Sequence, residues 1–125
     1  MHTKICPRII IFSLACVVLI KTSPALAHAF PEESQPAVGA ILNDAPKKVQ
    51  IRFDSRLEDA FSVIIVKDAD GNRVSGHTRL DPDSRKSLEV KLQTIAAGDY
   101  HVYWSVVSWD GHRTRGDYVF SVKSD

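Results

Sequence analysis

Apolar and polar residues alternate with a period of two through much of the chain after residue 48. The alternation is clear in residues 49–53 (VQIRF), residues 87–92 (SLEVKL) and residues 116–122 (GDYVFSV). Successive side chains of a β-strand point to opposite faces of a sheet, so each of these segments presents one apolar row to a core. No segment sustains a helical period with capping residues. The sequence therefore predicts an all-β fold.

Further strands and turns complete this pattern. Residues 61–68 (FSVIIVKD) are rich in β-branched side chains, and residues 98–108 form a long segment that starts at a glycine. Asp70-Gly71 is a strong turn signal, residues 56–60 fit one helical turn, and the prolines and glycine of residues 28–42 predict a bent edge strand. Short strands at close spacing predict a single antiparallel β-sandwich or barrel of about seven strands.

The first 27 residues have the features of an export signal. Lys4 and Arg8 make a basic start, and residues 9–20 form an almost unbroken apolar run. Ala25 and Ala27 then give the small-x-small pattern of a signal-peptidase site. The apolar run is shorter than the roughly 20 residues that a membrane-spanning helix needs. We therefore expect cleavage after Ala27 and export to the periplasm.

Cleavage leaves a mature domain of residues 28–125, and an uncleaved anchor or a lipoprotein modified at Cys16 are the alternatives. Cys6 and Cys16 are the two cysteines of the chain, so the mature domain has neither a disulfide nor a thiolate metal ligand. The signal holds three of the 16 basic residues and no acidic one, which leaves 13 basic against 15 acidic side chains. These charges are interleaved along the chain, so nucleic-acid binding is not expected.

Cleavage after Ala27 also gives His28 a free amine beside its imidazole. The amine nitrogen and Nδ1 can close a six-membered chelate ring on one metal ion. An α-amine has a pKa of about 7.7–8.0, far below that of lysine, so a metal can displace its proton near neutral pH. Two nitrogens from one residue suit tetragonal copper(II), the strongest binder among divalent first-row ions.

The segment SWDGH, residues 108–112, offers the remaining ligands. Asp110 and His112 are spaced i, i+2, so in an extended stretch their side chains lie on the same face. With His28 they supply three nitrogens and one carboxylate oxygen, a set that favours one copper(II) ion over zinc and over a thiolate-type copper(I) site. Asp-Gly is also a common turn signal between strands, and that plain structural role is the alternative.

Several segments resemble the CopC family of periplasmic copper-binding proteins. The family opens its mature chain with a histidine followed by Ser-x-Pro-Ala-x-Gly, which matches HAFPEESQPAVGAIL in residues 28–42. An Ala-Pro then leads into a strand that ends in Phe53. The family's closing block, Gly-x-Tyr-x-Val-x-Trp-x-Val-Val-Ser-x-Asp-x-His-x-x-x-Gly, matches residues 98–116. The resemblance covers nearly all of the mature chain.

The resemblance implies a Greek-key β-sandwich or barrel, Ig-like and cupredoxin-like in outline. It implies that His28, Asp110 and His112 bind copper(II), and that the copper is handed to a partner such as a CopD-like inner-membrane protein. We expect a monomer that carries or buffers one copper ion per chain. Some family members bind copper(I) through a methionine-rich loop, but Met1 is the single methionine here. A copper(I) site is therefore not expected.

The sequence departs from the family after the second strand. Many members have Ser-Glu there, whereas Asp54-Ser55 follows Phe53 in this chain. If the family glutamate holds the terminal amine, Asp54 or Glu58 is the candidate to replace it.

The remaining histidines and the tryptophans are expected to have structural roles. His77 lies in a predicted strand end or loop, and His101 lies on one face of a predicted strand. Neither is expected to bind copper. Trp104 is expected in the core, while Trp109 either shields the site or packs locally.

Two other functions would use the same fold. A copper-dependent monooxygenase also has an N-terminal histidine chelate, but oxygen activation needs an open coordination position, and here Asp110 would occupy one. An Ig-like interaction module without metal would leave the side chains of His28 and His112 apart. We expect a non-enzymatic copper(II) carrier.

Overall fold

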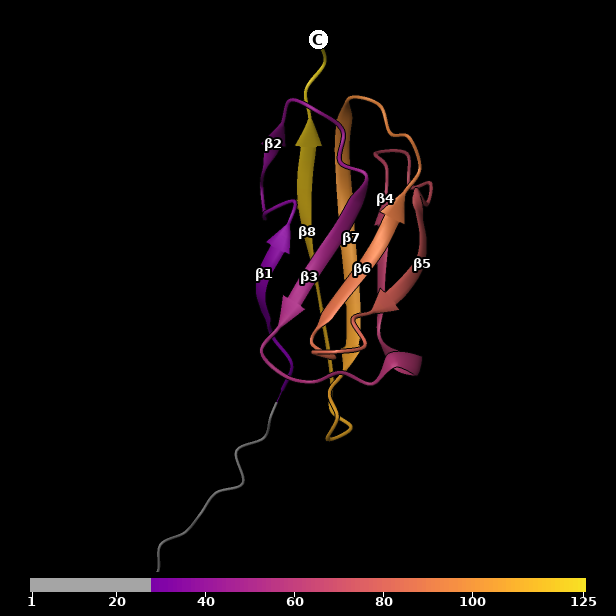
Figure 1. Cartoon of the computed structure of the whole chain (residues 1–125). Coiled ribbons are helices and arrows are strands. Elements are labelled where there is room, and N and C mark those ends of the chain that lie inside the picture. Colours follow the sequence, from indigo (N-terminus) through magenta and orange to yellow (C-terminus); the bar gives the residue numbers. More distant parts are fainter. Residues whose placement is uncertain (1–27) are drawn as a thin grey trace, which may run out of the picture.

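The computed structural model describes residues 28–125, and the export signal expected in residues 1–27 lies outside them. The described chain forms two four-stranded β-sheets packed face to face (Figure 1). A short 3-10 helix, Asp59–Phe61, precedes the fourth strand. The strands are β1 Pro31–Gln35, β2 Ile41–Leu42, β3 Lys48–Phe53, β4 Val63–Lys67, β5 Ser75–Leu80, β6 Ser87–Leu92, β7 Gly98–Val107 and β8 Arg113–Val122.

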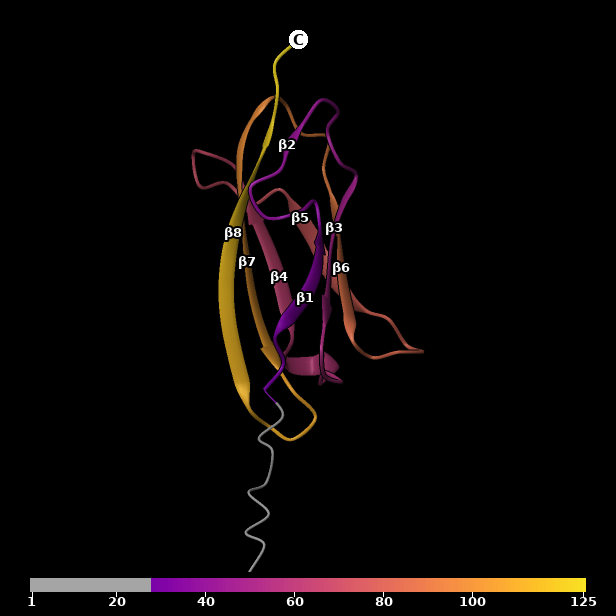
Figure 2. The same ribbon diagram turned by 90° about the vertical axis from the view of Figure 1, so that its left-hand side faces the viewer.

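The strands are divided between the sheets in the manner of a Greek-key sandwich. One sheet has the order β1-β3-β6-β5 and the other has the order β2-β8-β7-β4. The chain therefore crosses between the sheets five times, from β1 to β2, β2 to β3, β3 to β4, β4 to β5 and β6 to β7. The two layers are distinct when the molecule is viewed from its side (Figure 2). The fold is thus the sandwich of the two predicted architectures, and not a closed barrel.

The alternating apolar residues of the strands meet between the two layers. Val49, Ile51 and Phe53 of β3 are each at most 1% exposed, while Arg52 between them is exposed. Phe53 packs edge-on against Trp104 of β7, with ring centroids 5.4 Å apart. Each large apolar side chain buried in this way stabilises the fold by about 1.5–3 kcal/mol. The period-two pattern of the sequence therefore corresponds to the core of the sandwich, and Trp104 packs against it as predicted.

The predicted strands are confirmed, with differences at the sheet edges. β6 occupies residues 87–92 as predicted, and Gly71 makes the expected turn with a φ of 85°. β5 has the sequence SGHTRL and mostly exposed or half-exposed side chains, so it lacks a clear apolar alternation. β2 pairs with β8 in parallel, whereas the prediction was wholly antiparallel. The described residues thus form eight strands, where about seven were expected.

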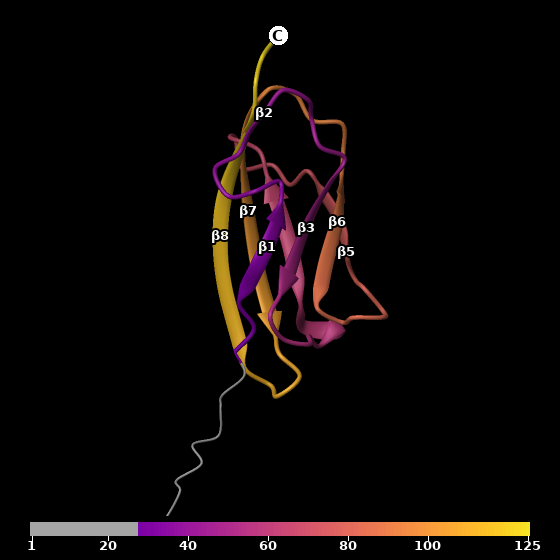
Figure 3. The ribbon, with the colours of Figure 1, turned by 60° about the vertical axis from the view of Figure 1, so that its left-hand side comes forward.

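Three segments meet at one end of the sandwich (Figure 3). They are the start of the described chain, the segment around the 3-10 helix Asp59–Phe61, and the turn between β7 and β8. The expected helical turn at residues 56–60 overlaps that helix by two residues. Within residues 28–125 no helix is long and apolar enough to cross a membrane. Because the end of β7 and the start of β8 lie at this end of the sandwich, residues 108–112 lie close to His28.

Candidate metal centre

Residues 108–112 form a tight turn that joins β7 to β8. The N–H of Ser108 donates to the carbonyl of His112 at 2.9 Å, and the N–H of Gly111 donates to the carbonyl of Ser108 at 2.8 Å. Gly111 has a φ of 89°, a left-handed conformation that favours glycine. The expectation of an extended Asp-x-His stretch was therefore wrong, because the Asp-Gly pair turns the chain. The turn nevertheless brings the side chains of Asp110 and His112 together.

The Asp110 carboxylate is oriented by hydrogen bonds within this turn. The buried hydroxyl of Ser108 and the N–H of His112 both donate to Oδ1 of Asp110. Oδ2 lies 3.2 Å from Nδ1 of His112. The hydrogen bond from Ser108 is the main cause that lowers the pKa of Asp110 below its usual value. Asp110 is therefore a carboxylate at neutral pH, with one oxygen engaged in the turn and the other facing His112.

His28 lies beside His112, at the start of the described chain. The ring centroids of the two imidazoles are 5.2 Å apart, in an edge-to-face arrangement. An imidazole nitrogen lies about 2 Å from a bound divalent metal, so two rings that share one ion have centroids within about 6 Å of each other. The separation of His28 and His112 therefore fits two ligands of one ion.

The chain after His28 is tied to both sheets. Ala29 is fully buried, and its carbonyl accepts a hydrogen bond from Oγ1 of Thr114 on β8 at 2.6 Å. The N–H of Phe30 donates to Oδ1 of Asp54 at 2.8 Å, and the N–H of Asp54 donates to the carbonyl of Phe30 at 2.9 Å. The Asp54 carboxylate therefore holds the amide of residue 30, two positions along the chain from the nitrogen of His28.

The close approaches at this end are pairwise. Within residues 28–125, no group of three or more His, Asp or Glu side chains is drawn together tightly enough to hold a metal ion as it stands. His28 lies beside His112, and His112 lies beside Asp110. In the full chain the nitrogen of His28 belongs to a peptide bond, and cleavage after Ala27 would convert it to an amine. The three predicted ligands therefore do not converge on one point in this arrangement.

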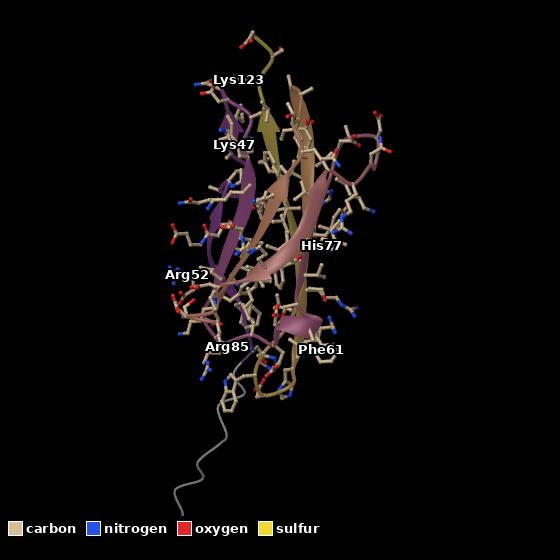
Figure 4. All side chains as sticks on the ribbon, turned by 45° about the vertical axis from the view of Figure 1, so that its right-hand side comes forward. Lys47, Arg52, Phe61, His77, Arg85 and Lys123 are labelled. Carbon is tan, nitrogen blue, oxygen red and sulfur yellow. The ribbon has the colours of Figure 1, made fainter. Side chains whose placement is uncertain are left out.

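The other candidate residues lie elsewhere or have other partners. His77 is exposed on β5, the edge strand of the sheet that does not contain β7 and β8 (Figure 4). His101 is paired through Nε2 with Asp117 at 2.5 Å and stacks on Tyr103, whose ring centroid is 4.3 Å away. Trp109, next to Asp110, is 64% exposed, so most of its surface faces solvent and not the core.

Two residues of this site were not singled out from the sequence. Ser108 stands at the start of the turn, where serine hydroxyls often hydrogen-bond to nearby backbone groups, as Ser108 does to the carbonyl of His112 at 3.2 Å. Thr114 gives no comparable signal, since its partner is the carbonyl of Ala29, 85 residues earlier in the sequence. Such a long-range contact requires the fold to be known.

Comparison with known proteins supplies the relatives of this chain. The family model described as CopC domain matches residues 31–123. The copper transport protein CutJ of Bacillus subtilis (strain 168) is 36% identical over 115 residues, which make up 90% of this chain and 21% of CutJ. This chain therefore spans about a fifth of the length of that relative.

Two solved structures share the fold. The crystal structure of CopC from Methylosinus trichosporium OB3b matches with a TM-score of 0.73 and 31% identity, over 77% of this chain and 94% of that chain. PcoC, a methionine-rich copper resistance protein from Escherichia coli, matches with a TM-score of 0.69 and 29% identity, over 78% of this chain and 100% of that chain. With the domain match over residues 31–123, these likenesses show that the chain belongs to the CopC family.

Proposed function

We propose that the mature protein, beginning at His28, binds one copper(II) ion and carries or buffers it without chemical turnover. The observation that carries the proposal is the adjacency of His28 and His112, whose rings lie 5.2 Å apart. Membership of the CopC family and a relative named as a copper transport protein support copper as the cargo.

The chemistry of the proposed ligands supports copper(II). The amine and Nδ1 of His28 would form the chelate, and the imidazole of His112 would add a third nitrogen. Oδ1 of Asp110 already accepts hydrogen bonds from Ser108 and His112, so Oδ2 is the oxygen available to the ion. Nitrogen-rich sets with one carboxylate suit tetragonal copper(II), and no soft sulfur ligand is present in the mature sequence.

Export and handover complete the proposal. Signal cleavage after Ala27 would deliver the domain to the periplasm and free the amine of His28 in one step. The chain matches about a fifth of the length of CutJ, a copper transport protein. This partial match supports a role in which the domain passes copper to a separate, larger transport protein. We propose a CopD-like inner-membrane protein as the recipient and a monomer as the carrier.

The alternatives make different predictions about the same residues. An interaction module without metal predicts that His28 and His112 stay apart, and their rings are instead in contact range. A copper monooxygenase needs a free coordination position, which the Asp110 carboxylate beside His112 would take. The carrier is therefore the function that we propose.

The decisive experiment compares two termini of the same protein. One protein begins at His28, as intact mass would verify, and the other carries a single glycine before His28. Copper(II) is titrated into each, affinity is measured by competition with a chelator, and the electron paramagnetic resonance spectrum is recorded. The glycine leaves every side chain in place but replaces the chelate of the His28 amine and Nδ1 with a different chelate, in which the glycine amine and the His28 amide nitrogen take part.

The expected result is one equivalent of copper with a tetragonal, nitrogen-rich spectrum for the protein that begins at His28. The glycine-extended protein should give a different spectrum, because its terminal Gly-His unit binds copper(II) through the glycine amine, the deprotonated amide of His28 and Nδ1, and this binding should no longer depend on His112 or Asp110. Weak, non-stoichiometric binding that is the same for both termini would overturn the carrier proposal.

A further inference from the structure

The two residues that follow His28 are held at points on opposite sheets. Oγ1 of Thr114, on β8, donates to the carbonyl of Ala29 at 2.6 Å, and Ala29 itself is fully buried. Asp54, just after β3, exchanges two hydrogen bonds with Phe30, at 2.8 and 2.9 Å. We call these contacts of Thr114 and Asp54 the terminal clamp.

The clamp connects the segments that carry the two imidazoles. Ala29 directly follows His28, and Thr114 lies two residues after His112. The hydrogen bond from Thr114 therefore joins the chain start to β8 close to both rings. A buried carbonyl such as that of Ala29 needs a hydrogen-bond partner, so the loss of the Thr114 hydroxyl would favour release of this segment.

Asp54 holds the same segment from the other sheet. Pro31, the first residue of β1, has no N–H to donate to β3. The N–H of Phe30, one residue earlier, instead reaches the carboxylate of Asp54. Ser55 donates to the same oxygen at 3.2 Å and so orients the carboxylate. Hydrogen bonding between the chain start and this sheet therefore extends one residue closer to His28 than β1 does.

Resting on the proposed function, we propose that Thr114 and Asp54 are positioning residues that hold the amine and imidazole of His28 against His112. Chain termini are poorly ordered unless they are tied down. A terminus that is fixed before the metal arrives loses less entropy on chelation, so the ion is bound more tightly. Neither positioning residue has to touch the ion for this effect.

Matched substitutions separate the hydrogen bonds from other effects. Thr114→Val keeps the shape of the side chain and removes the donor, while Thr114→Ser keeps a hydroxyl. Asp54→Ala removes the acceptor, while Asp54→Asn keeps an oxygen for the N–H of Phe30. Each variant is prepared with the native terminus and with one glycine before His28, and its copper(II) affinity is measured by chelator competition.

With the native terminus, Thr114→Val and Asp54→Ala should each weaken copper(II) binding by about tenfold or more, as is typical when a residue that orients a ligand is lost. Thr114→Ser and Asp54→Asn should retain most of the affinity. With glycine before His28, the valine and alanine variants should cause little loss, because the chelate that the clamp positions is already replaced.

A metal-free measurement tests the same inference. The backbone 15N heteronuclear NOE of Ala29 and Phe30 should fall in Thr114→Val and in Asp54→Ala, while the NOE values within β7 and β8 stay unchanged. The inference is overturned if affinity and NOE match those of the wild type, or if the glycine-extended background shows the same loss. If the wild type and the variants bind copper(II) equally tightly, the inference about the terminal clamp is wrong and the proposed function stands. Wild-type protein that binds no copper(II) would remove the proposed function, and the inference with it.

Discussion

The imidazole rings of His28 and His112 lie 5.2 Å apart, although one residue starts the described chain and the other precedes its last strand. The proximity arises because the chain start and the β7–β8 turn share one end of the sandwich. Thr114 stabilises this proximity, since its hydroxyl donates a hydrogen bond to the carbonyl of Ala29. The site is thus assembled by strand order and by one long-range hydrogen bond, and not by neighbours in sequence alone.

Replacement of His112 should remove a proposed copper(II) ligand while leaving the fold intact. His112 is exposed in the turn, so its loss creates no cavity in the core. His112→Ala should weaken copper(II) binding by more than about a hundredfold, since loss of a ligand should exceed the roughly 10–100-fold effect of losing a residue that only orients a ligand. Chelator competition on the protein that begins at His28 measures the change. His101→Ala is the matched control, because His101 is paired with Asp117 on the outer sheet face. Equal losses for the two variants would contradict the assignment.

Ser108 should control the ionisation and the orientation of Asp110. Its hydroxyl hydrogen bond is the main cause that lowers the pKa of Asp110. In Ser108→Ala the pKa of Asp110 should rise toward its usual value, which a carboxyl 13C NMR titration of the metal-free protein would detect. Copper(II) affinity at neutral pH should fall by about tenfold, because the freed carboxylate can turn away from His112.

Ser121→Ala is the control for this substitution. Ser121 also donates to a carboxylate, that of Asp99 at 2.6 Å, but it lies on β8 outside the metal centre. The control should leave both the Asp110 titration and the copper(II) affinity unchanged. An unchanged Asp110 titration in Ser108→Ala would show that the turn holds the carboxylate without the serine.

Much of the fold could be predicted from the sequence because local patterns specify it. The alternation in residues 49–53 and 87–92 corresponds to β3 and β6, and Asp70-Gly71 makes its turn. β5 was missed because a strand at a sheet edge buries little and so shows little alternation. The two-residue strand β2 is too short to leave any period, and its parallel pairing with β8 is a property of the whole fold.

The sequence proposes the residues of the candidate site but not the hydrogen bonds that support it. His28, Asp110 and His112 are marked by the expected signal cleavage and by the Asp-x-His spacing. The turn at Gly111 replaced the expected extended stretch, because a glycine with positive φ reverses the chain more readily than any other residue. Thr114 could not be identified, since a threonine in a strand has no local sign that it binds a residue 85 positions earlier in the sequence.

Gly116 should be essential for the packing of Trp104. A Cβ atom on Gly116 would lie 2.3 Å from Cζ2 of Trp104, far inside contact distance. Gly116→Ala should therefore shift the indole away from Phe53 and lower the free energy of unfolding by about 1–3 kcal/mol. Urea denaturation followed by tryptophan fluorescence measures this loss.

Gly76→Ala is the matched control, since its Cβ would meet only the carbonyl of Lys91 at an ordinary 3.7 Å. The control should change the free energy of unfolding by less than about 0.5 kcal/mol, as is typical for surface positions. Equal stability of the two variants would mean that Trp104 can repack without cost.

Tyr118 should make the fold sensitive to strong alkali. Its side chain is 7% exposed, and its hydroxyl donates to the carbonyl of Pro36 at 3.0 Å. Burial raises the pKa of Tyr118 from 10.0 to about 12. The unfolded chain therefore loses this proton before the folded chain does. The stability that the neutral phenol contributes is complete below pH 10 and is lost as the pH rises from 10 to about 12, at up to about 1.4 kcal/mol per pH unit.

Stability measured by urea denaturation at a series of alkaline pH values tests this expectation. Tyr118→Phe removes the titrating group, so its free energy of unfolding should fall less steeply above pH 10 than that of the wild type. Tyr103→Phe serves as the control, because Tyr103 is 41% exposed on the outer face of β7 and its loss should leave the steep decline in place. If Tyr118→Phe and the wild type decline in parallel through this range, the phenol of Tyr118 does not stay protonated in the fold, and the sandwich admits water at the Tyr118–Pro36 contact.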